Sequence, residues 1–312
     1  MIKIDLITGF LGAGKTTLLK QYAAYLMSRG EKLGILEYDY GAVNVDMMLL
    51  QELRGPACEL EMLAAGCDAE NLRRRFHSRL IAMAMSGYDR VIVEPSGIFD
   101  MDDFFDTLRE EPLDRFYEIG NVITVVAADL PENLSAEENF LLASQAADAG
   151  CIVLSRTQLC PAEEREQVRE HIRRAAAEIH VESFHPVYLE KDWSELTEAD
   201  WHLLAGCGYL VNDYVKITAG SESIGFSSLC LMNLTEDEES LQKAVRSIFT
   251  DPECGKILRI KGFVKAEDGW SEINATEKMF HVKHLAQGQN VLLVIGRELQ
   301  ETAIKKYLQI EK

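Results

Sequence analysis

Short apolar runs alternate with amphipathic stretches through the first two thirds of the chain. The amphipathic stretches repeat apolar residues at intervals of three and four, as Val168, Ile172 and Ala176 do within residues 162–179, and this spacing predicts helices. The apolar runs predict strands at residues 2–8, 33–38, 90–94, 121–127, 151–155 and 186–189. Strands and helices in alternation predict an α/β fold, in which a mostly parallel sheet carries helices on both faces.

The first amphipathic stretch covers residues 16–29 and follows the first apolar run closely. We expect this helix to end before Gly30, because glycine takes the left-handed conformation after a last helical turn at the least steric cost.

The pattern changes after Gly208. Residues 217–225, rich in serine and glycine, predict a connection, and a tight turn is predicted at residues 267–269. Strand-like runs then occupy residues 226–232, 256–264, 269–275, 279–284 and 290–295, with helices predicted at 238–249 and 299–308. Short strands joined by tight turns favour an antiparallel sheet with helices on one face, a smaller α+β domain. We therefore predict two domains, residues 1–212 and 213–312.

Charge and cysteine content narrow the functional classes. The 312 residues carry 32 Lys and Arg against 51 Asp and Glu, a formal net charge of −19, which argues against binding to nucleic acid or to an anionic membrane. No stretch approaches the ~18 uninterrupted apolar residues of a membrane span. The seven cysteines are scattered and odd in number, as expected of reduced thiols in the cytoplasm. A soluble cytoplasmic protein is predicted.

Residues 9–16, GFLGAGKT, match the phosphate-binding pattern G-x-x-x-x-G-K-[ST] between the first predicted strand and helix. The glycines allow backbone N–H groups to surround phosphates at a helix N-terminus. Lys15 is predicted to bridge the β- and γ-phosphates and Thr16 to ligate Mg²⁺. The candidate nucleotide-binding residues here are Gly9, Gly12, Ala13, Gly14, Lys15, Thr16 and Thr17.

Acidic residues end two further predicted strands. Glu94, in the sequence Glu94-Pro95-Ser96-Gly97, could hold Mg²⁺ directly or through water, and the Gly97 amide could sense the γ-phosphate. Asp39 could orient Mg²⁺ or the attacking water, with Asp46 as a further acid. Lys15, Asp39 and Glu94 are therefore the candidate catalytic residues, although a loop-capping role remains open for each aspartate and an ordinary strand-end role for Glu94.

These motifs together resemble those of the CobW-type P-loop GTPases, relatives of the metal-insertion GTPases HypB and UreG. The resemblance rests on GFLGAGKTT, on residues 39–46 (DYGAVNVD), on Gly66-Cys67 and on Glu94–Gly97, and it extends to residues 257–264 and 294–296 near the end of the chain. It implies GTP hydrolysis with Mg²⁺, coupled to delivery of a transition metal such as zinc or cobalt, or of a corrinoid cofactor, to a client protein.

The sequence departs from the family pattern at the thiol cluster. The family has Gly-Cys-x-Cys-Cys, whereas residues 66–70 are GCDAE, so Cys67 alone is kept. One thiol with neighbouring carboxylates is a poor site for a soft metal. Cys67 is then either a small packed thiol or one ligand of a site that the client completes.

The base-recognition loop departs as well. The family's Asn-Lys-x-Asp is replaced by Ser155-Arg156-Thr157-Gln158. A carboxylate accepts from both guanine N1–H and N2–H₂, whereas Gln158 offers one acceptor and one donor, so its amide could pair with adenine instead. Arg156 could still stack on the base plane. GTP is therefore implied by the resemblance, and ATP stays open.

Two other functions remain compatible with a P-loop. One is a small-molecule kinase, which needs an acceptor pocket beside the γ-phosphate. The other is a nucleotide-gated interaction protein with negligible hydrolysis. Basal turnover is expected to be slow for the GTPase, because no residue stands out as an arginine finger.

Overall fold

The computed structural model describes residues 1–10, 12–39, 45–64, 69–97, 101–215, 226–266, 269–277, 279–285, 288 and 290–309. The chain divides into two compact units, each considered by itself below. The larger is formed by residues 1–39, 49–63 and 67–219, and the smaller by residues 220–312 together with 40–48 and 64–66.

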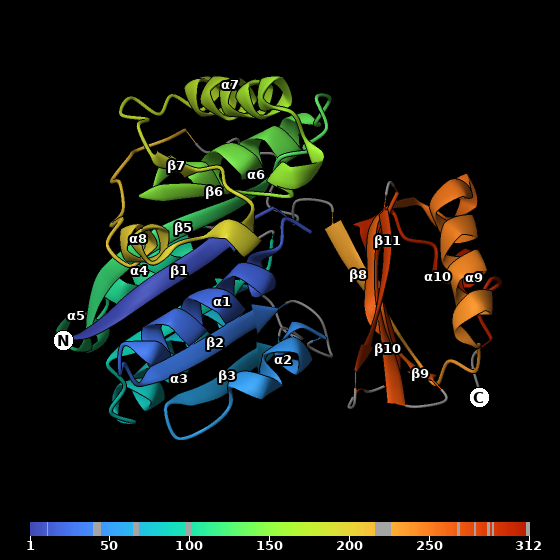
Figure 1. The fold of residues 1–312 in the computed structure, drawn as a ribbon, viewed down its shortest axis with the longest axis horizontal. Helices are drawn as coiled ribbons and strands as arrows, with labels where there is room; N and C mark the ends of the chain where they lie inside the picture. Colours follow the sequence, from blue (N-terminus) through green and yellow to red (C-terminus); the bar gives the residue numbers. More distant parts are fainter. Residues whose placement is uncertain are drawn as a thin grey trace. The chain divides into compact units, whose positions relative to one another are not determined.

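The larger unit is built on a seven-stranded sheet, in the order β3-β2-β4-β1-β5-β6-β7 (Figure 1). The pairs β2–β4, β4–β1, β1–β5, β5–β6 and β6–β7 are all parallel, which confirms the predicted parallel sheet. The strands are β1 (Ile2–Gly9), β2 (Leu33–Asp39), β3 (Cys58–Ala64), β4 (Arg90–Pro95), β5 (Tyr117–Ala127), β6 (Cys151–Ser155) and β7 (Val187–Leu189). The apolar pattern did not predict β3, in which Glu59 and Glu61 alternate with apolar residues.

Helices cover both faces of this sheet, as predicted. Leu18, Tyr22 and Leu26 of α1 pack with Leu204 of α8 on one face, while α6 and α7 pack on the other through residues such as Leu142. The helices are α1 (Lys15–Ser28), α2 (Val45–Leu50), α3 (Ala69–Ala84), α4 (Met101–Arg109), α5 (Leu113–Phe116), α6 (Ala136–Ala147), α7 (Ala162–Glu178) and α8 (Glu198–Leu204).

Helix α1 ends as its sequence predicts. Gly30 takes φ +87°, and its N–H donates to the carbonyl of Met27. A side chain at Gly30 would meet no atom within 4 Å, so the left-handed backbone itself is what favours glycine here.

The smaller unit holds a five-stranded sheet, in the order β11-β10-β9-β12-β8, and the register of every neighbouring pair is antiparallel. Its α9 and α10 pack on one face through Ile260, Ile273 and Val294 (Figure 1), as predicted. Its elements are β8 (Phe226–Met232), α9 (Glu238–Thr250), β9 (Lys256–Ala266), β10 (Gly269–Thr276), β11 (Met279–Leu285), β12 (Val291–Arg297) and α10 (Glu301–Ile304). The last helix is shorter than predicted, and i→i−3 bonds continue the turns to Leu308.

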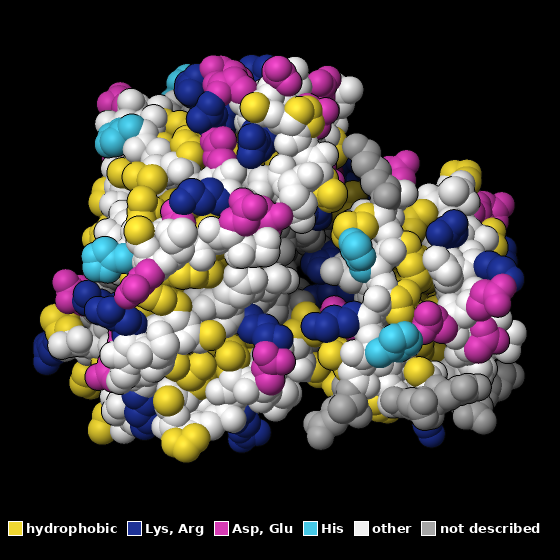
Figure 2. Space-filling model, viewed as in Figure 1, with side chains coloured by type: hydrophobic (Ala, Val, Ile, Leu, Met, Phe, Trp, Pro, Cys, Tyr) yellow, Lys and Arg dark blue, Asp and Glu magenta, His cyan; other side chains and the backbone are white. Residues whose placement is uncertain are grey.

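Charged side chains of both signs are mixed on the face that Figure 2 shows, where Lys and Arg lie singly or in small groups among acidic and polar residues. Among the helices of the described residues, none combines the length and the apolar character that a membrane span requires.

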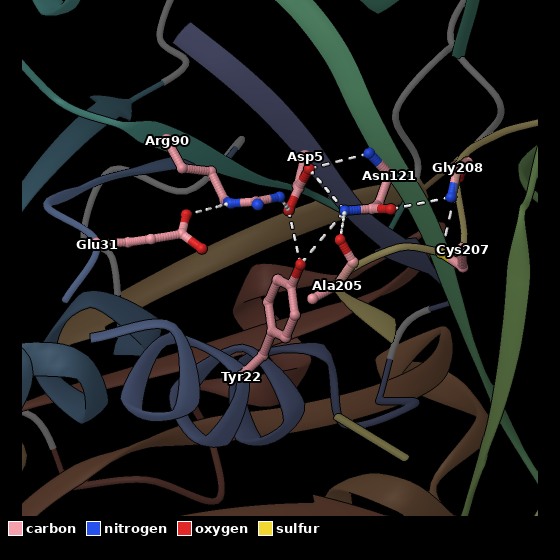
Figure 3. Close-up of polar contacts among 8 residues, drawn as sticks. All are labelled: Asp5, Tyr22, Glu31, Arg90, Asn121, Ala205, Cys207 and Gly208. Atoms are coloured by element: carbon pink, nitrogen blue, oxygen red, sulfur yellow. Dashed lines mark hydrogen bonds and ion pairs between the residues drawn. The ribbon is translucent and has the colours of Figure 1, made fainter. Parts of the chain in front are cut away.

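A buried charge network holds α1 on the sheet (Figure 3). Asp5, in the middle of β1, is fully buried, and its Oδ2 accepts from the hydroxyl of Tyr22 at 2.7 Å and from Nη1 of Arg90 at 2.7 Å. The Nε of Arg90 donates in turn to Glu31 at 2.8 Å. Burial, followed by the nearby Asp5 charge, raises the pKa of Tyr22 well above its usual value, so this hydroxyl stays protonated and keeps donating.

Strand β5 is shaped around the same carboxylate. The register with β1 shifts between Ile4 and Leu6, which places Gly120 and Asn121 opposite Asp5 in a bulge. A Cβ on Gly120 would lie 2.3 Å from Asp5 Oδ1. That oxygen accepts from the backbone N–H and the amide of Asn121, whose side-chain oxygen accepts from Gly208 N–H. The carboxylate thus ties β1, β5 and residue 208 together.

We expect Asp5→Asn to destabilise the larger unit by about 3–5 kcal/mol, because it leaves the Arg90 guanidinium buried without its main counter-charge. Urea unfolding measures this, followed by the fluorescence of Trp193 and Trp201 in a Trp270→Phe background.

The matched control is Glu170→Gln, which removes an exposed pair with Arg173 on α7 and should change stability by less than about 1 kcal/mol. An Asp5→Asn protein that unfolds at the wild-type urea concentration would contradict this role of the network.

Candidate functional site

Three segments that are far apart in sequence end at one edge of the larger sheet. Strands β2, β4 and β1 are adjacent in that order and parallel, so their carboxyl ends lie together. Gly9 ends β1 and leads into the phosphate loop, Glu94 and Pro95 end β4, and Asp39 ends β2. Open α/β folds bind their ligands at this edge.

The loop after β1 has the backbone that its glycines predict. Gly9, Gly12 and Gly14 take φ values of +139°, +79° and +99°. A Cβ on Gly9 would lie 2.1 Å from the carbonyl oxygen of Val125, so no larger residue fits there. The Nζ of Lys15 donates to the Gly9 carbonyl at 3.0 Å across the loop. The curled loop therefore leads directly into the N-terminus of α1, where backbone N–H groups favour anions.

Thr16 and Glu94 meet beneath this loop. The Thr16 hydroxyl donates to Glu94 Oε1 at 2.8 Å across 78 residues of sequence, and the two residues are only 8% and 3% exposed. A hydroxyl and a carboxylate are hard oxygen ligands of the kind that Mg²⁺ prefers. The pair is thus suited to hold Mg²⁺ beside a bound phosphate.

Glu37 is a second buried carboxylate of this edge, and the sequence analysis missed it. It lies opposite Glu94 in the β2–β4 register and is 2% exposed. Ile35 and Ile92, two residues before each, both pack beneath α1, so Glu37 and Glu94 lie on the face that α1 covers. The available signal was a charged residue inside the apolar run at 33–38, two residues before Asp39, the acid that the sequence pattern favoured.

The predicted base-recognition loop lies beside the phosphate loop. The guanidinium of Arg156 donates to Asp129 at 2.8 Å and to the carbonyl of Gly12 at 3.2 Å. Arg156 itself takes φ +57°, and the turn that follows exposes Gln158. Asp129, which lies in the turn after β5, was not singled out from the sequence.

Two hydroxyls of that loop are buried. Ser155 and Thr157 are each 4% exposed, and neither hydroxyl bonds to any of the described residues. Buried polar groups usually find a partner. Ser155 Cβ lies 3.9 Å from the position of a Cβ on Gly14, so this loop and the phosphate loop are in close proximity.

Trp193 also lies beside Gly14. Its indole ring would lie 3.2 Å from a Cβ on Gly14, and its Nε1 donates to the carbonyl of Leu154 at 3.1 Å. The turn that carries it is fixed by Asp192, which accepts from the N–H and hydroxyl of Ser194. These two bonds hold the pKa of Asp192 below its usual value.

The other predicted residues are placed as follows. Thr17 is exposed on α1 and Gly97 is buried after β4. Cys67, like the side chains of Asp39 and Asp46, lies outside the described residues. Over the part of the chain that is described, no three His, Cys, Asp or Glu side chains are grouped as a metal site would require.

The chain is similar to several curated proteins. It is 30% identical over 187 residues to zinc chaperone YjiA of Escherichia coli (strain K12), covering 56% of this chain and 55% of that protein. It is 25% identical over 178 residues to zinc-regulated GTPase metalloprotein activator 1 of Schizosaccharomyces pombe, covering 55% of this chain and 43% of that protein. The chain thus spans about half the length of the curated relatives it matches.

Among solved structures, the Zn(II)-bound YjiA GTPase from E. coli aligns over 98% of this chain and 97% of that chain, with 20% identity and a TM-score of 0.38.

Two family models match the sequence. The model of the CobW/HypB/UreG nucleotide-binding domain matches residues 3–182, and the model of the cobalamin synthesis protein cobW C-terminal domain matches residues 231–310. The first match alone covers more than half of the chain and includes the phosphate loop, Glu94 and the base-recognition loop. The chain therefore belongs to the CobW/HypB/UreG family and carries a CobW-type C-terminal domain.

Proposed function

We propose that the protein is a GTPase that couples hydrolysis to delivery of a metal, zinc or cobalt, or of a corrinoid cofactor, to a client protein. The observation that carries the proposal is the Thr16–Glu94 pair at 2.8 Å beneath the phosphate loop, in a chain of the CobW/HypB/UreG family. The names of two curated relatives, a zinc chaperone and a zinc-regulated GTPase activator, support the metal cargo. The described cysteines are free, which suits the reducing cytoplasm.

Each residue of the proposed site has a role that follows from its position. Backbone N–H groups of residues 12–17 and the Lys15 ammonium hold the phosphates at the N-terminus of α1. Thr16 and Glu94, with Asp39 at the end of β2, hold Mg²⁺, which when bound neutralises charge on the phosphates. Glu94 and Asp39 also orient the attacking water. The two domains are residues 1–212 and 213–312, divided where the sequence pattern changes after Gly208. The second domain contacts the client.

Base choice is set by the loop after β6. Hydrogen bonds to Asp129 and to the Gly12 carbonyl hold the Arg156 guanidinium in place. The Arg156 side chain therefore lies beside the phosphate loop and offers a surface on which a base can stack. Gln158 stands where the family carboxylate would read guanine, and it is exposed. We therefore propose that GTP is preferred only modestly over ATP.

Lys15→Ala should weaken binding of a non-hydrolysable GTP analogue about ten- to a hundred-fold, because it removes a charge-assisted contact to the phosphates, and binding by the wild type should depend on Mg²⁺. Calorimetry with and without EDTA measures both, and single-turnover hydrolysis by the wild type establishes the reaction.

The matched control is Lys20→Ala, on the same helix, where the ammonium pairs with Glu52 and affinity should stay at the wild-type value. Unchanged affinity in Lys15→Ala, or wild-type hydrolysis only when a small-molecule acceptor is added, would refute the GTPase proposal.

Gln158→Asp should raise the preference for GTP over ATP by about 1–3 kcal/mol, because a carboxylate accepts from both guanine donors. Competition binding of the two triphosphates gives the ratio directly. Leu159→Asp, at the adjacent and 65% exposed position, adds the same charge without the contact and should leave the ratio unchanged. A wild-type protein that already prefers GTP by several orders of magnitude would show that the base is read elsewhere.

The isolated protein should not hold zinc tightly through Cys67, because one thiol with carboxylates lacks the three or four ligands of a closed zinc site. A titration against a chelator of known affinity tests this, with Cys67→Ser and, as a control thiol, Cys230→Ser. We expect the three proteins to bind zinc alike. One zinc per chain at sub-nanomolar affinity, lost only in Cys67→Ser, would contradict the expectation and place the cargo site on this chain alone.

A further inference from the structure

A buried amide on α6 contacts the turn that follows β4. Gln145 is fully buried, and its Nε2 donates to the carbonyl oxygen of Gly97 at 2.9 Å. Gly97 is the last residue of the sequence Glu94-Pro95-Ser96-Gly97 and is itself buried. The contact joins two segments 48 residues apart, and it links α6 to the turn that begins two residues after the end of β4.

The helical turn that carries Gln145 is itself anchored to the sheet. The backbone carbonyl of Gln145 accepts from the Thr124 hydroxyl at 2.6 Å, and Thr124 on β5 is fully buried. Thr124 lies opposite Thr8 in the β1–β5 register, and Thr8 directly precedes the phosphate loop. Gln145 therefore connects the Gly97 turn to the strand pair from which the phosphate loop begins.

The Gly97 turn is held at a second point. The N–H of Ser96 donates to the carbonyl of Tyr38 on β2 at 2.7 Å. One bond thus fixes the start of the turn to β2 and the other fixes the Gly97 carbonyl to α6. The peptide group that carries the Gly97 N–H lies between these two bonded points.

The buried Gln145 side chain has only part of its hydrogen-bonding capacity satisfied by the described residues. Its Oε1 is buried, and none of the described residues donates to it. An apolar residue of similar size would fill the same space on α6 without burying this oxygen. The contact that the amide does make, to Gly97, is the feature that an apolar residue could not supply.

We propose that Gln145 is a positioning residue for triphosphate recognition and hydrolysis, and that it acts by fixing the Gly97 turn so that the Gly97 N–H meets the γ-phosphate. The inference rests on the proposed function and adds a residue outside its motifs. Because a diphosphate has no γ-phosphate, Gln145 contributes to triphosphate binding and to turnover and leaves diphosphate binding unaffected.

The test is Gln145→Leu, which keeps the volume and removes the donor. We expect single-turnover GTP hydrolysis to fall about ten- to a hundred-fold, as small displacements of positioning groups do. Affinity for the non-hydrolysable GTP analogue should fall several-fold, while affinity for GDP stays within twofold of wild type. A residue with only a packing role would instead move both affinities together, or neither.

Ser144→Ala is the matched control, because the Ser144 hydroxyl is buried on the same helix and, among the described residues, bonds only to the Leu141 carbonyl within that helix. It should behave as wild type in all three measurements. A folded Gln145→Leu protein with wild-type turnover and an unchanged ratio of triphosphate to diphosphate affinity would overturn the proposal.

Two further measurements keep the outcome clear. If Gln145→Leu does not fold, Thr124→Val removes the anchor of the same helical turn and should lower triphosphate affinity selectively; equal affinities to wild type would overturn the inference. If the wild type binds GTP without hydrolysing it, the proposed function fails, and the triphosphate-to-diphosphate ratio of Gln145→Leu still decides the role of Gln145.

Discussion

The parallel pairing of β4 between β1 and β2 is the constraint on which the candidate site depends. It brings the carboxyl ends of three strands to one edge, so that Thr16 and Glu94 meet at 2.8 Å although 78 residues separate them. The same register sets Glu37 beside Glu94. A one-residue slip would turn either carboxylate to the opposite face of the sheet, which makes the strand register as important to this site as the identity of its residues.

The middle of β1 has a different role. Asp5 is fully buried and joins α1, β4 and β5 through Tyr22, Arg90 and Asn121. Burying such a network costs desolvation free energy. Removing one member alone destabilises the fold, because the partner charge then stays buried without compensation. Its effect here is geometric: α1 is fixed along the sheet, and with it the N-terminal turn that carries Lys15 and Thr16. The proposed phosphate site at one end of α1 is thus supported by the hydrogen bond from Tyr22 to Asp5 farther along the helix.

The departures from the family motifs have different structural consequences. At the base-recognition loop, Arg156 keeps a fixed position through Asp129 and the Gly12 carbonyl, so the loop remains packed beside the phosphate loop although its reading residue is Gln158. At the thiol cluster, replacement of two cysteines changes the donor set itself. In the proposed function, the first departure bears on which base is chosen, and the second bears on whether a metal site is complete on one chain.

Local sequence patterns predicted the strands, helices and turns that depend on neighbouring residues alone. Gly30 predicted left-handed backbone after α1, because glycine takes that conformation at the least steric cost. The alternation of apolar runs and amphipathic stretches predicted the parallel sheet, and short strands with tight turns predicted the antiparallel second sheet. Strand β3 was missed because its glutamates break the apolar run. The contacts of Asp129 with Arg156 and of Gln145 with Gly97 were decided only by the tertiary structure. A polar side chain on a helix or after a strand carries no signal of its partner until packing brings two distant segments together.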